Sequence, residues 1–338
     1  MPDREEVGAA LAGIADPSGG GSVLETGRAG GLRLKDGVAG LVLSVDGLTQ
    51  DVAERLRAEV EVALRRVPRV TGVRIILTAD KAAAPAGVAV AQDSAVPGIR
   101  RLVAVASGKG GVGKSTVAAN LAVALAKRGL AVGLLDADIY GPSVPTLLGI
   151  PGRAQLEDGK LLPMTAHGIK ALSIGMMMAT DKAVIWRGPM AASAMMQMIE
   201  QANWGVLDIL VIDLPPGTGD IQLTMAQKLK PSGAVVVSTP QDLALIDARR
   251  AIAMFNEVKV PVLGMVENMS TFVCPHCGER SDIFGHGGAA ALGEGLGVPF
   301  LGAVPLTMTL RLASDAGQPG SAPEFAGIAE RVAIGLGL

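Results

Sequence analysis

The chain is poor in cysteine, histidine and aromatic residues. Its 338 residues include two cysteines, three histidines and one tyrosine, and aromatic residues make up 2% of the total. The core must therefore be built from aliphatic side chains and alanine. Two cysteines are too few for the disulfide framework of a secreted domain, and their close spacing fits a reducing compartment better.

The chain also lacks the segments that direct a protein to membranes, nucleic acids or export. No apolar run approaches the roughly 18 residues of a membrane span. The formal net charge is −2 and the basic residues form no long run, which argues against a general nucleic-acid binder. Residues 1–6 contain no basic segment followed by an apolar one, so they predict no export signal. We expect a cytoplasmic protein with neither a membrane nor a nucleic acid as partner.

Glycine and proline, by contrast, are abundant, with 45 and 20 residues. They suit the many tight connections of an α/β protein. Within 99–338, short apolar runs alternate with helical stretches, and strands that are apolar on both faces are typical of a parallel sheet covered by helices. The sequence therefore predicts one doubly wound α/β domain with a mostly parallel sheet. Its predicted strands lie near 102–106, 130–135, 209–212, 234–237, 262–266 and 300–304.

Residues 1–80 follow a different pattern, that of a small α+β domain. Apolar side chains recur on one face of a predicted helix at 51–67, and another helix is predicted at 5–14. Predicted strands occupy 41–45 and 73–77. The segment 81–98 is rich in alanine, proline and glycine without periodicity, which predicts a flexible linker.

A phosphate-binding loop lies between the first predicted strand of the larger domain and the helix at 115–127. Residues 107–116 read SGKGGVGKST and contain the pattern G-x-x-x-x-G-K-S in its required strand–loop–helix context. Glycines let the backbone approach phosphate oxygens closely, and amides at the helix N-terminus point at them. We expect Lys114 to reach the β- and γ-phosphates of ATP and the Ser115 hydroxyl to bind Mg²⁺. The predicted nucleotide-binding residues of this loop are Gly108, Lys109, Gly110, Gly111, Val112, Gly113, Lys114, Ser115 and Thr116.

Acidic residues follow two of the predicted strands. Asp213 follows the strand at 209–212, and Asp136 and Asp138 follow the strand at 130–135. The carboxyl ends of parallel strands form the ligand-binding edge of such a sheet. We expect Asp213 to support Mg²⁺ there, with Gly217 free to contact the γ-phosphate. An aspartate at a strand end is often only a turn former, but two such positions beside a phosphate loop favour a nucleotide site.

Both cysteines belong to one short motif, Cys274-Pro275-His276-Cys277. A tetrahedral sulfur site for zinc or an iron–sulfur cluster takes about four ligands, so the motif is either half of a metal site or a self-contained redox pair. A thioredoxin-like pair would begin a helix beside a βαβ unit, and buried inert thiols are a further alternative. The spacing from Cys277 to His286 is not that of a zinc finger, so we expect both nearby histidines to be solvated loop residues.

The phosphate loop resembles the deviant loop KGGVGKST of the Min, partition and nitrogenase-iron-protein ATPases, because Lys109 follows the first glycine. In that group the extra lysine crosses a dimer interface to the partner's nucleotide, so the resemblance implies an ATP-dependent homodimer. It also implies that Asp138 positions the attacking water, that Asp136 lies on the magnesium side, and that Asn268 contacts the adenine edge. The predicted catalytic residues are Lys109, Lys114, Asp138 and Asp213.

The chain resembles more closely the Mrp/ApbC family of iron–sulfur cluster carriers, over roughly 99–310. Residues 1–80 resemble, more weakly, the small domain often fused in front of these carriers. The Asp-Pro-Glu of that domain stands here as Asp16-Pro17-Ser18, and residues 1–80 hold no cysteine, which argues against a metal site there. The matching motifs of the larger domain are, in order, 138–143 (DIYGPS), 186–189 (WRGP), 213–220 (DLPPGTGD), 239–242 (TPQD), 267–269 (ENM) and Cys274-x-x-Cys277.

This second resemblance implies a homodimeric ATPase that holds a [4Fe–4S] cluster between two copies of Cys274 and Cys277. It further implies transfer of the cluster to apo-proteins, with scaffold proteins as additional partners. Ligand count alone also allows a zinc site shared by two chains. The alternative function is a Min- or partition-type positioning switch without a cluster. Its membrane form needs a basic amphipathic C-terminal helix, whereas 323–338 contains Arg331 as its one basic residue.

Overall fold

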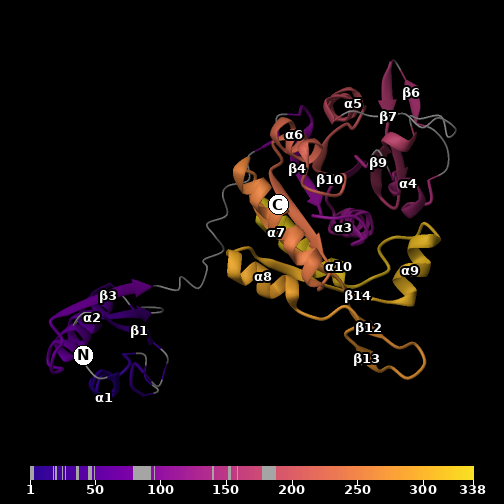
Figure 1. The fold of residues 1–338 in the computed structure, drawn as a ribbon. Coiled ribbons are helices and arrows are strands. Elements are labelled where there is room, and N and C mark those ends of the chain that lie inside the picture. The colour runs from indigo at the N-terminus through magenta and orange to yellow at the C-terminus, as the bar shows by residue number, and fades with distance from the viewer. Residues whose placement is uncertain are drawn as a thin grey trace. The chain divides into compact units, whose positions relative to one another are not determined.

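The structure is a computed structural model of the chain, which divides into two compact units, 1–85 and 86–338 (Figure 1). Most of the predicted linker lies outside the described residues, as do Ser18, Ile139, Tyr140, Trp186 and Arg187 of the family motifs. The structure describes residues 4–17, 19, 21–24, 26, 28–35, 38–44, 48, 50–78, 93–94, 96–138, 141–150, 154–157, 159–176 and 188–338.

The smaller unit packs two helices with a three-stranded sheet, and both predicted helices and both predicted strands are confirmed. Its elements are α1 (Arg4–Ala12), β1 (Ala29–Lys35), β2 (Val38–Ser44), α2 (Gln50–Arg65) and β3 (Gly72–Thr78). Strand β2 pairs with β1 antiparallel and with β3 parallel. Strand β1 escaped prediction because its two glycines weaken the strand pattern. Asp16 is buried and accepts a hydrogen bond from Arg28 Nε at 2.8 Å, so a charge pair occupies the position of the family's Asp-Pro-Glu.

A nine-stranded sheet forms the centre of the larger unit (Figure 1). The strand order is β13-β12-β11-β4-β10-β5-β9-β8, with β14 paired to β12. Strands β8 and β13 run antiparallel to their neighbours, and every other pairing is parallel. The predicted doubly wound α/β fold is confirmed. The strands are β4 (Ile99–Ala106), β5 (Val132–Asp136), β8 (Met164–Ala166), β9 (Ile169–Ser173), β10 (Leu207–Asp213), β11 (Gly233–Ser238), β12 (Val262–Val273), β13 (Arg280–Ser281) and β14 (Phe300–Leu306).

Helices cover both faces of this sheet, and the core between the layers is aliphatic and rich in alanine, as predicted. Helices α3 (Lys114–Lys127) and α10 (Glu324–Leu336) pack on one face. The other face is covered by α5 (Gly188–Gln201), α6 (Asp220–Leu229), α7 (Asp242–Glu257) and α8 (Gly288–Leu296). No described helix is long and apolar enough to cross a membrane. The remaining elements are α4 (Val144–Leu147), β6 (Gln155–Glu157), β7 (Lys160–Leu162), a 3-10 turn (Ile174–Met176) and α9 (Met308–Asp315).

Strand β12 extends beyond the apolar run that predicted it. The prediction ended at Val266, whereas the strand continues to Val273 through a buried polar stretch. Glu267 is fully buried because its two carboxylate oxygens accept hydrogen bonds from the backbone amides of Gly287 and Ala289, at 2.9 and 2.8 Å, where α8 begins. A negative charge at a helix N-terminus is stabilised there. A polar stretch can therefore continue a buried strand when a neighbouring element supplies its partners.

Candidate nucleotide site and cysteine hairpin

The phosphate loop opens a pocket of about 260 Å³ at the carboxyl edge of the sheet, between β4 and α3. Gly113 lies directly before α3 with φ of 79°, a left-handed conformation that suits glycine. No described side chain caps α3, so its first backbone amides remain free for an anion. The pocket is lined by Ser107, Gly110, Gly111, Gly113, Lys114, Ser115, Thr116, Asp138, Ser143, Leu147 and Pro216.

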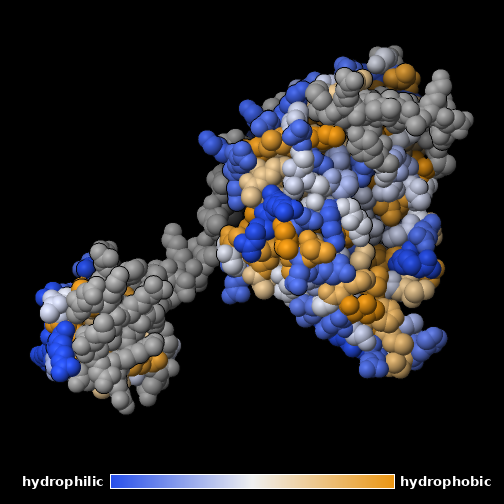
Figure 2. All heavy atoms as spheres, in the orientation of Figure 1, coloured by the Kyte–Doolittle hydropathy of each residue, from blue (hydrophilic) through white to orange (hydrophobic). Residues whose placement is uncertain are grey.

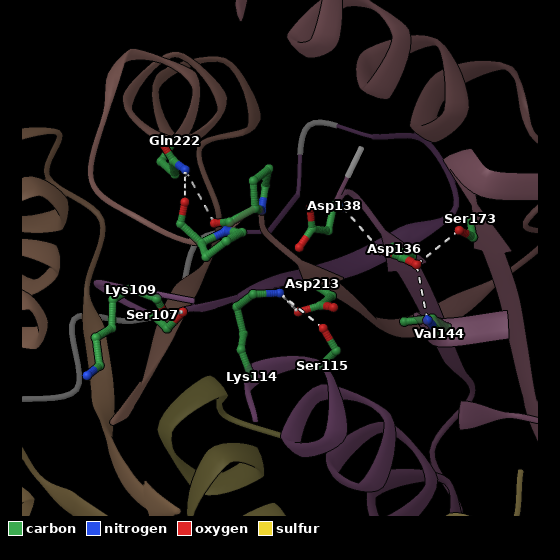
Figure 3. Close-up of polar contacts among 12 residues, drawn as sticks. Ser107, Lys109, Lys114, Ser115, Asp136, Asp138, Val144, Ser173, Asp213 and Gln222 are labelled. Carbon is green, nitrogen blue, oxygen red and sulfur yellow. Dashed lines mark hydrogen bonds and ion pairs between the residues drawn. The ribbon is translucent and has the colours of Figure 1, made fainter. Parts of the chain in front are cut away.

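Three predicted loop residues do not line this pocket. Val112 is buried in the core with 2% of its surface exposed. Gly108 lies against α7, where a Cβ atom would come 2.1 Å from the carbonyl carbon of Asp247. The side chain of Lys109 points away from Lys114 and from the pocket (Figure 3). Gly108 and Val112 thus shape the loop through packing, and Lys109 is directed outward.

Lys114, which lines the pocket, forms a buried ion pair with Asp213 (Figure 3). The Lys114 ammonium also lies 3.3 Å from the Ser115 hydroxyl oxygen. Burial raises the pKa of Asp213, and the charge of Lys114 opposes that shift. The second carboxylate oxygen of Asp213 is buried and has no hydrogen-bond partner among the described residues. An unpaired buried carboxylate oxygen beside a hydroxyl fits Mg²⁺, which takes oxygen ligands and is usually held by one or two carboxylates plus phosphate.

Asp136 lies beside Asp213 because the parallel register of β5 and β10 pairs these two residues. One Asp136 oxygen accepts hydrogen bonds from Ser173 Oγ at 3.0 Å and from the Val144 amide at 3.2 Å. The other accepts from the Asp138 amide at 3.1 Å. Burial, reinforced by the negative charge of Asp213, raises the pKa of Asp136 to about 7. Nothing in the pattern of the sequence indicated Ser173, which reaches the site from the end of β9.

The loop after Asp213 is tied to the phosphate loop. Gly217, predicted to be free, donates its backbone amide to the Ser107 carbonyl at 2.9 Å, so that expectation is wrong for this structure. Two prolines precede Gly217 and have no N–H to donate. The Gln222 side-chain amide donates to the Pro216 carbonyl and so links this loop to α6 (Figure 3). Sequence reasoning missed Gln222, since a glutamine in a helix gives no signal of such a contact.

Asn268 also contacts the phosphate loop. Its side-chain amide donates to the Val112 carbonyl at 2.9 Å, and 5% of the residue is exposed. A Cβ atom on Gly113 would come 2.1 Å from the Asn268 amide nitrogen. The residue predicted to contact adenine therefore packs against the backbone of the phosphate loop in this structure.

The cysteines lie in a hairpin between β12 and β13 that projects from the larger unit (Figures 1 and 2). The hairpin turn closes with a hydrogen bond from the Gly278 amide to the Cys274 carbonyl at 2.9 Å, and the φ of Gly278 is +74°. Cys274 is half-buried and Cys277 is exposed. Backbone amides of Cys277 and His276 donate to the Cys274 sulfur and lower the pKa of its thiol.

This geometry removes two of the alternatives for the cysteines. The pair begins no helix, unlike a thioredoxin-like pair, and it is not buried. The structure confirms that His276 and His286 are exposed. Within the described ranges, no three His, Cys, Asp or Glu side chains gather in a group that could hold a metal. The hairpin thus presents two cysteine side chains, fewer than the four ligands of a tetrahedral sulfur site.

The sequence model of the ParA family described as NUBPL iron-transfer P-loop NTPase matches residues 98–332. The chain belongs to this family. A model described as iron-sulfur cluster assembly protein matches residues 4–75. The expected resemblance to nucleotide-dependent iron–sulfur carriers is thereby confirmed.

Curated relatives of the chain carry related names. The iron-sulfur cluster carrier protein of Escherichia coli K12 is 52% identical over 251 residues, which are 71% of this chain and 68% of that protein. The Arabidopsis thaliana protein named iron-sulfur protein required for NADH dehydrogenase, mitochondrial, is 54% identical over 224 residues, or 66% of this chain and 72% of that protein.

Solved structures share the fold of the larger unit. A nucleotide-binding protein from Archaeoglobus fulgidus in complex with ADP is 44% identical, with a TM-score of 0.60, and the match covers 67% of this chain and 90% of that one. The Pyrococcus furiosus cell division ATPase MinD is 21% identical with a TM-score of 0.52, over 69% of this chain and 98% of that one. At that identity the likeness to MinD shows the fold alone.

Proposed function

We propose that the chain hydrolyses ATP and carries a [4Fe–4S] cluster as cargo, held between two copies and delivered to apo-proteins. The observation that carries this proposal is the pair formed by half-buried Cys274 and exposed Cys277, which offers two thiolates where a cluster takes about four. A second copy related by a two-fold axis would supply the other two. The names of the relatives support the nature of the cargo. Exposed thiols favour the reducing cytoplasm, with scaffold proteins as the source of the cluster.

The nucleotide step follows from the pocket. Lys114 would exchange Asp213 for the β- and γ-phosphates of ATP, which frees the Asp213 carboxylate. Asp213 and Ser115 would then hold Mg²⁺, with Asp136 beside them, and the ion would neutralise charge on the phosphates. Asp138 lines the pocket, where its carboxylate can orient the attacking water. Lys109 points out of its own pocket, which supports a role at the nucleotide of the partner copy.

Anaerobic reconstitution with iron and sulfide tests the cargo. We expect about four iron and four sulfide per two chains in the wild type, since a [4Fe–4S] cluster takes four thiolates. Cys274→Ser and Cys277→Ser should each lose the cluster. The matched control is His276→Ala, which changes an exposed residue between the two ligands and should retain it. Stoichiometric zinc without sulfide, or a cluster retained in both serine variants, would contradict the proposal.

A further inference from the structure

Strand β12 connects the two candidate sites directly. Asn268 in this strand donates its side-chain amide to the Val112 carbonyl of the phosphate loop at 2.9 Å. Cys274, the first residue of the cysteine motif, directly follows the end of the same strand at Val273. One continuous segment thus touches the phosphate loop at one point and carries a thiol at its end.

Asn268 packs tightly against the phosphate loop. Asn268 is buried, and its amide nitrogen occupies the space that a Cβ atom on Gly113 would need, at 2.1 Å. The methyl carbon of Met269 would lie 3.8 Å from the same Cβ atom. Close-packed contacts of this kind transmit displacement, because neither side can move without the other. A phosphate that rearranges Val112 and Gly113 must therefore shift Asn268.

The strand is irregular between Asn268 and the cysteines. Strand β12 advances from Asn268 to Phe272 while its partner β14 advances only from Val304 to Leu306. The extra residues form a bulge, and Met269 adopts a φ of +55°, which is uncommon for a residue other than glycine. Such strained backbone is held by its surroundings and can change when they change.

The strand is fixed on the other side of this bulge. The buried Glu267 carboxylate accepts two backbone amides at the start of α8, and Ser238 of β11 pairs with the same residue in register. Beyond the bulge, Phe272 and Val273 pair with β13 of the projecting hairpin. A displacement of Asn268 is therefore blocked toward Glu267 and directed toward the hairpin.

We propose that Asn268 is a positioning residue that couples occupancy of the phosphate loop to the conformation of the cysteine hairpin. The bulge at 269–271 is the element that switches between two conformations. The phosphate loop and the cysteine hairpin each shift the balance between them. Nucleotide binding shifts Val112 and Asn268, the bulge rearranges, and the exposure of Cys274 and Cys277 changes. The inference rests on the proposed function only in treating the thiols as the cargo site.

Thiol alkylation in cluster-free, full-length protein tests the coupling. The alkylation rates of Cys274 and Cys277 with a maleimide are measured by mass spectrometry, with and without saturating MgADP. We expect MgADP to change the rate in the wild type by about fivefold or more, the lower range of allosteric coupling. Asn268→Ala should abolish this change. Each variant is compared at its own saturating MgADP concentration, so a difference in affinity does not enter the ratio.

A matched control and a second variant separate coupling from general loosening. Asn120 is also buried beside the loop, and its amide donates to the Thr116 carbonyl at 2.8 Å, but it lies in α3. Asn120→Ala should keep the wild-type response. Met269→Gly retains the Asn268 contact while glycine adopts positive φ without strain, so it should weaken the response even where Asn268→Ala fails to fold.

Three outcomes would overturn the coupling: no MgADP response in the wild type, a full response in Asn268→Ala, or an equal loss in Asn120→Ala. A normal response in a protein that fails to assemble a cluster would leave the coupling intact and remove the proposed cargo. The reverse result would keep the cargo and remove the coupling.

Discussion

The phosphate pocket and the cysteine hairpin lie at the same edge of one sheet and are built in opposite ways. In the pocket, the side chains of Lys114, Asp213 and Asp136 are buried and paired within the chain: Lys114 forms an ion pair with Asp213, and hydrogen-bond donors surround Asp136. The hairpin projects from the unit, and the sulfur of Cys274 accepts hydrogen bonds from the backbone amides of Cys277 and His276. The difference fits two kinds of chemistry. Hydrolysis needs fixed charges in a dry site, whereas a cargo that is transferred needs ligands at the surface.

The largest expected effect is on ATP hydrolysis, which should depend on the pocket and not on the hairpin. Lys114→Ala should lower ATP hydrolysis by about 100- to 1000-fold, because it removes a preorganised positive charge from the transferred phosphate. Phosphate release from cluster-free protein measures this loss. Cluster assembly in the same variant should match the wild type, since the hairpin makes no use of Lys114. Loss of both activities together would mean that the two regions are not separable.

The next largest effect is on the free energy of unfolding, which should fall for a substitution in the pocket and not for one in the hairpin. Asp213→Ala leaves the Lys114 ammonium, 5% exposed, without its partner, and should lower the free energy of unfolding by about 3 kcal/mol. Cys277→Ala changes an exposed residue and should stay within about 0.5 kcal/mol of the wild type. Urea denaturation of the nucleotide-free protein measures both. Equal losses would show that the hairpin is as well supported as the pocket.

A pH dependence of stability and of nucleotide affinity should come from the pocket. The pKa of Asp136 is raised to about 7 in the folded protein, so the carboxyl holds a proton that the unfolded chain has already lost. The contribution of Asp136 to stability therefore falls as pH rises from about 4 to about 7. Mg²⁺ needs the ionised carboxylate, so affinity for MgADP should rise about tenfold per pH unit below 7 and level off above it.

Two variants check the assignment to Asp136 by calorimetric titration of MgADP across pH. Asp136→Asn should remove the pH dependence. Ser173→Ala removes the 3.0 Å hydrogen bond from Ser173 Oγ to the ionised Asp136 carboxylate. The midpoint of the change in MgADP affinity should therefore move to higher pH. An unchanged midpoint in both variants would assign the titration to another group.

The smallest expected effect distinguishes the two thiols. Backbone amides lower the pKa of Cys274. Below its usual titration range, Cys274 should therefore react faster with iodoacetamide than it would without these amides, although the lower nucleophilicity of the thiolate offsets part of the gain. The comparison with Cys277 is made by mass spectrometry at neutral pH and above pH 9. A ratio that does not fall at high pH would indicate that exposure, not ionisation, sets the rates.

Much of the pocket was predictable because it is local in sequence. The loop at 107–116 encodes its own conformation through glycines and a following helix, and Asp213 follows an apolar strand that marks its position. The contacts that tune the site were not predictable. Ser173 and Gln222 reach it from elements that carry no motif. The extension of β12 was missed because the rule for buried strands counts apolar residues, and the partners of Glu267 lie in a distant helix.

By itself, the sequence determined the doubly wound fold, the phosphate loop and the incompleteness of the cysteine pair, since each depends on spacing within a short segment. Only the tertiary structure decided which groups meet. It paired Lys114 with Asp213, aligned Asp136 beside them through the register of two parallel strands, and turned Asn268 onto the phosphate loop. Those contacts join residues far apart along the chain, and close packing around one sheet brings them together.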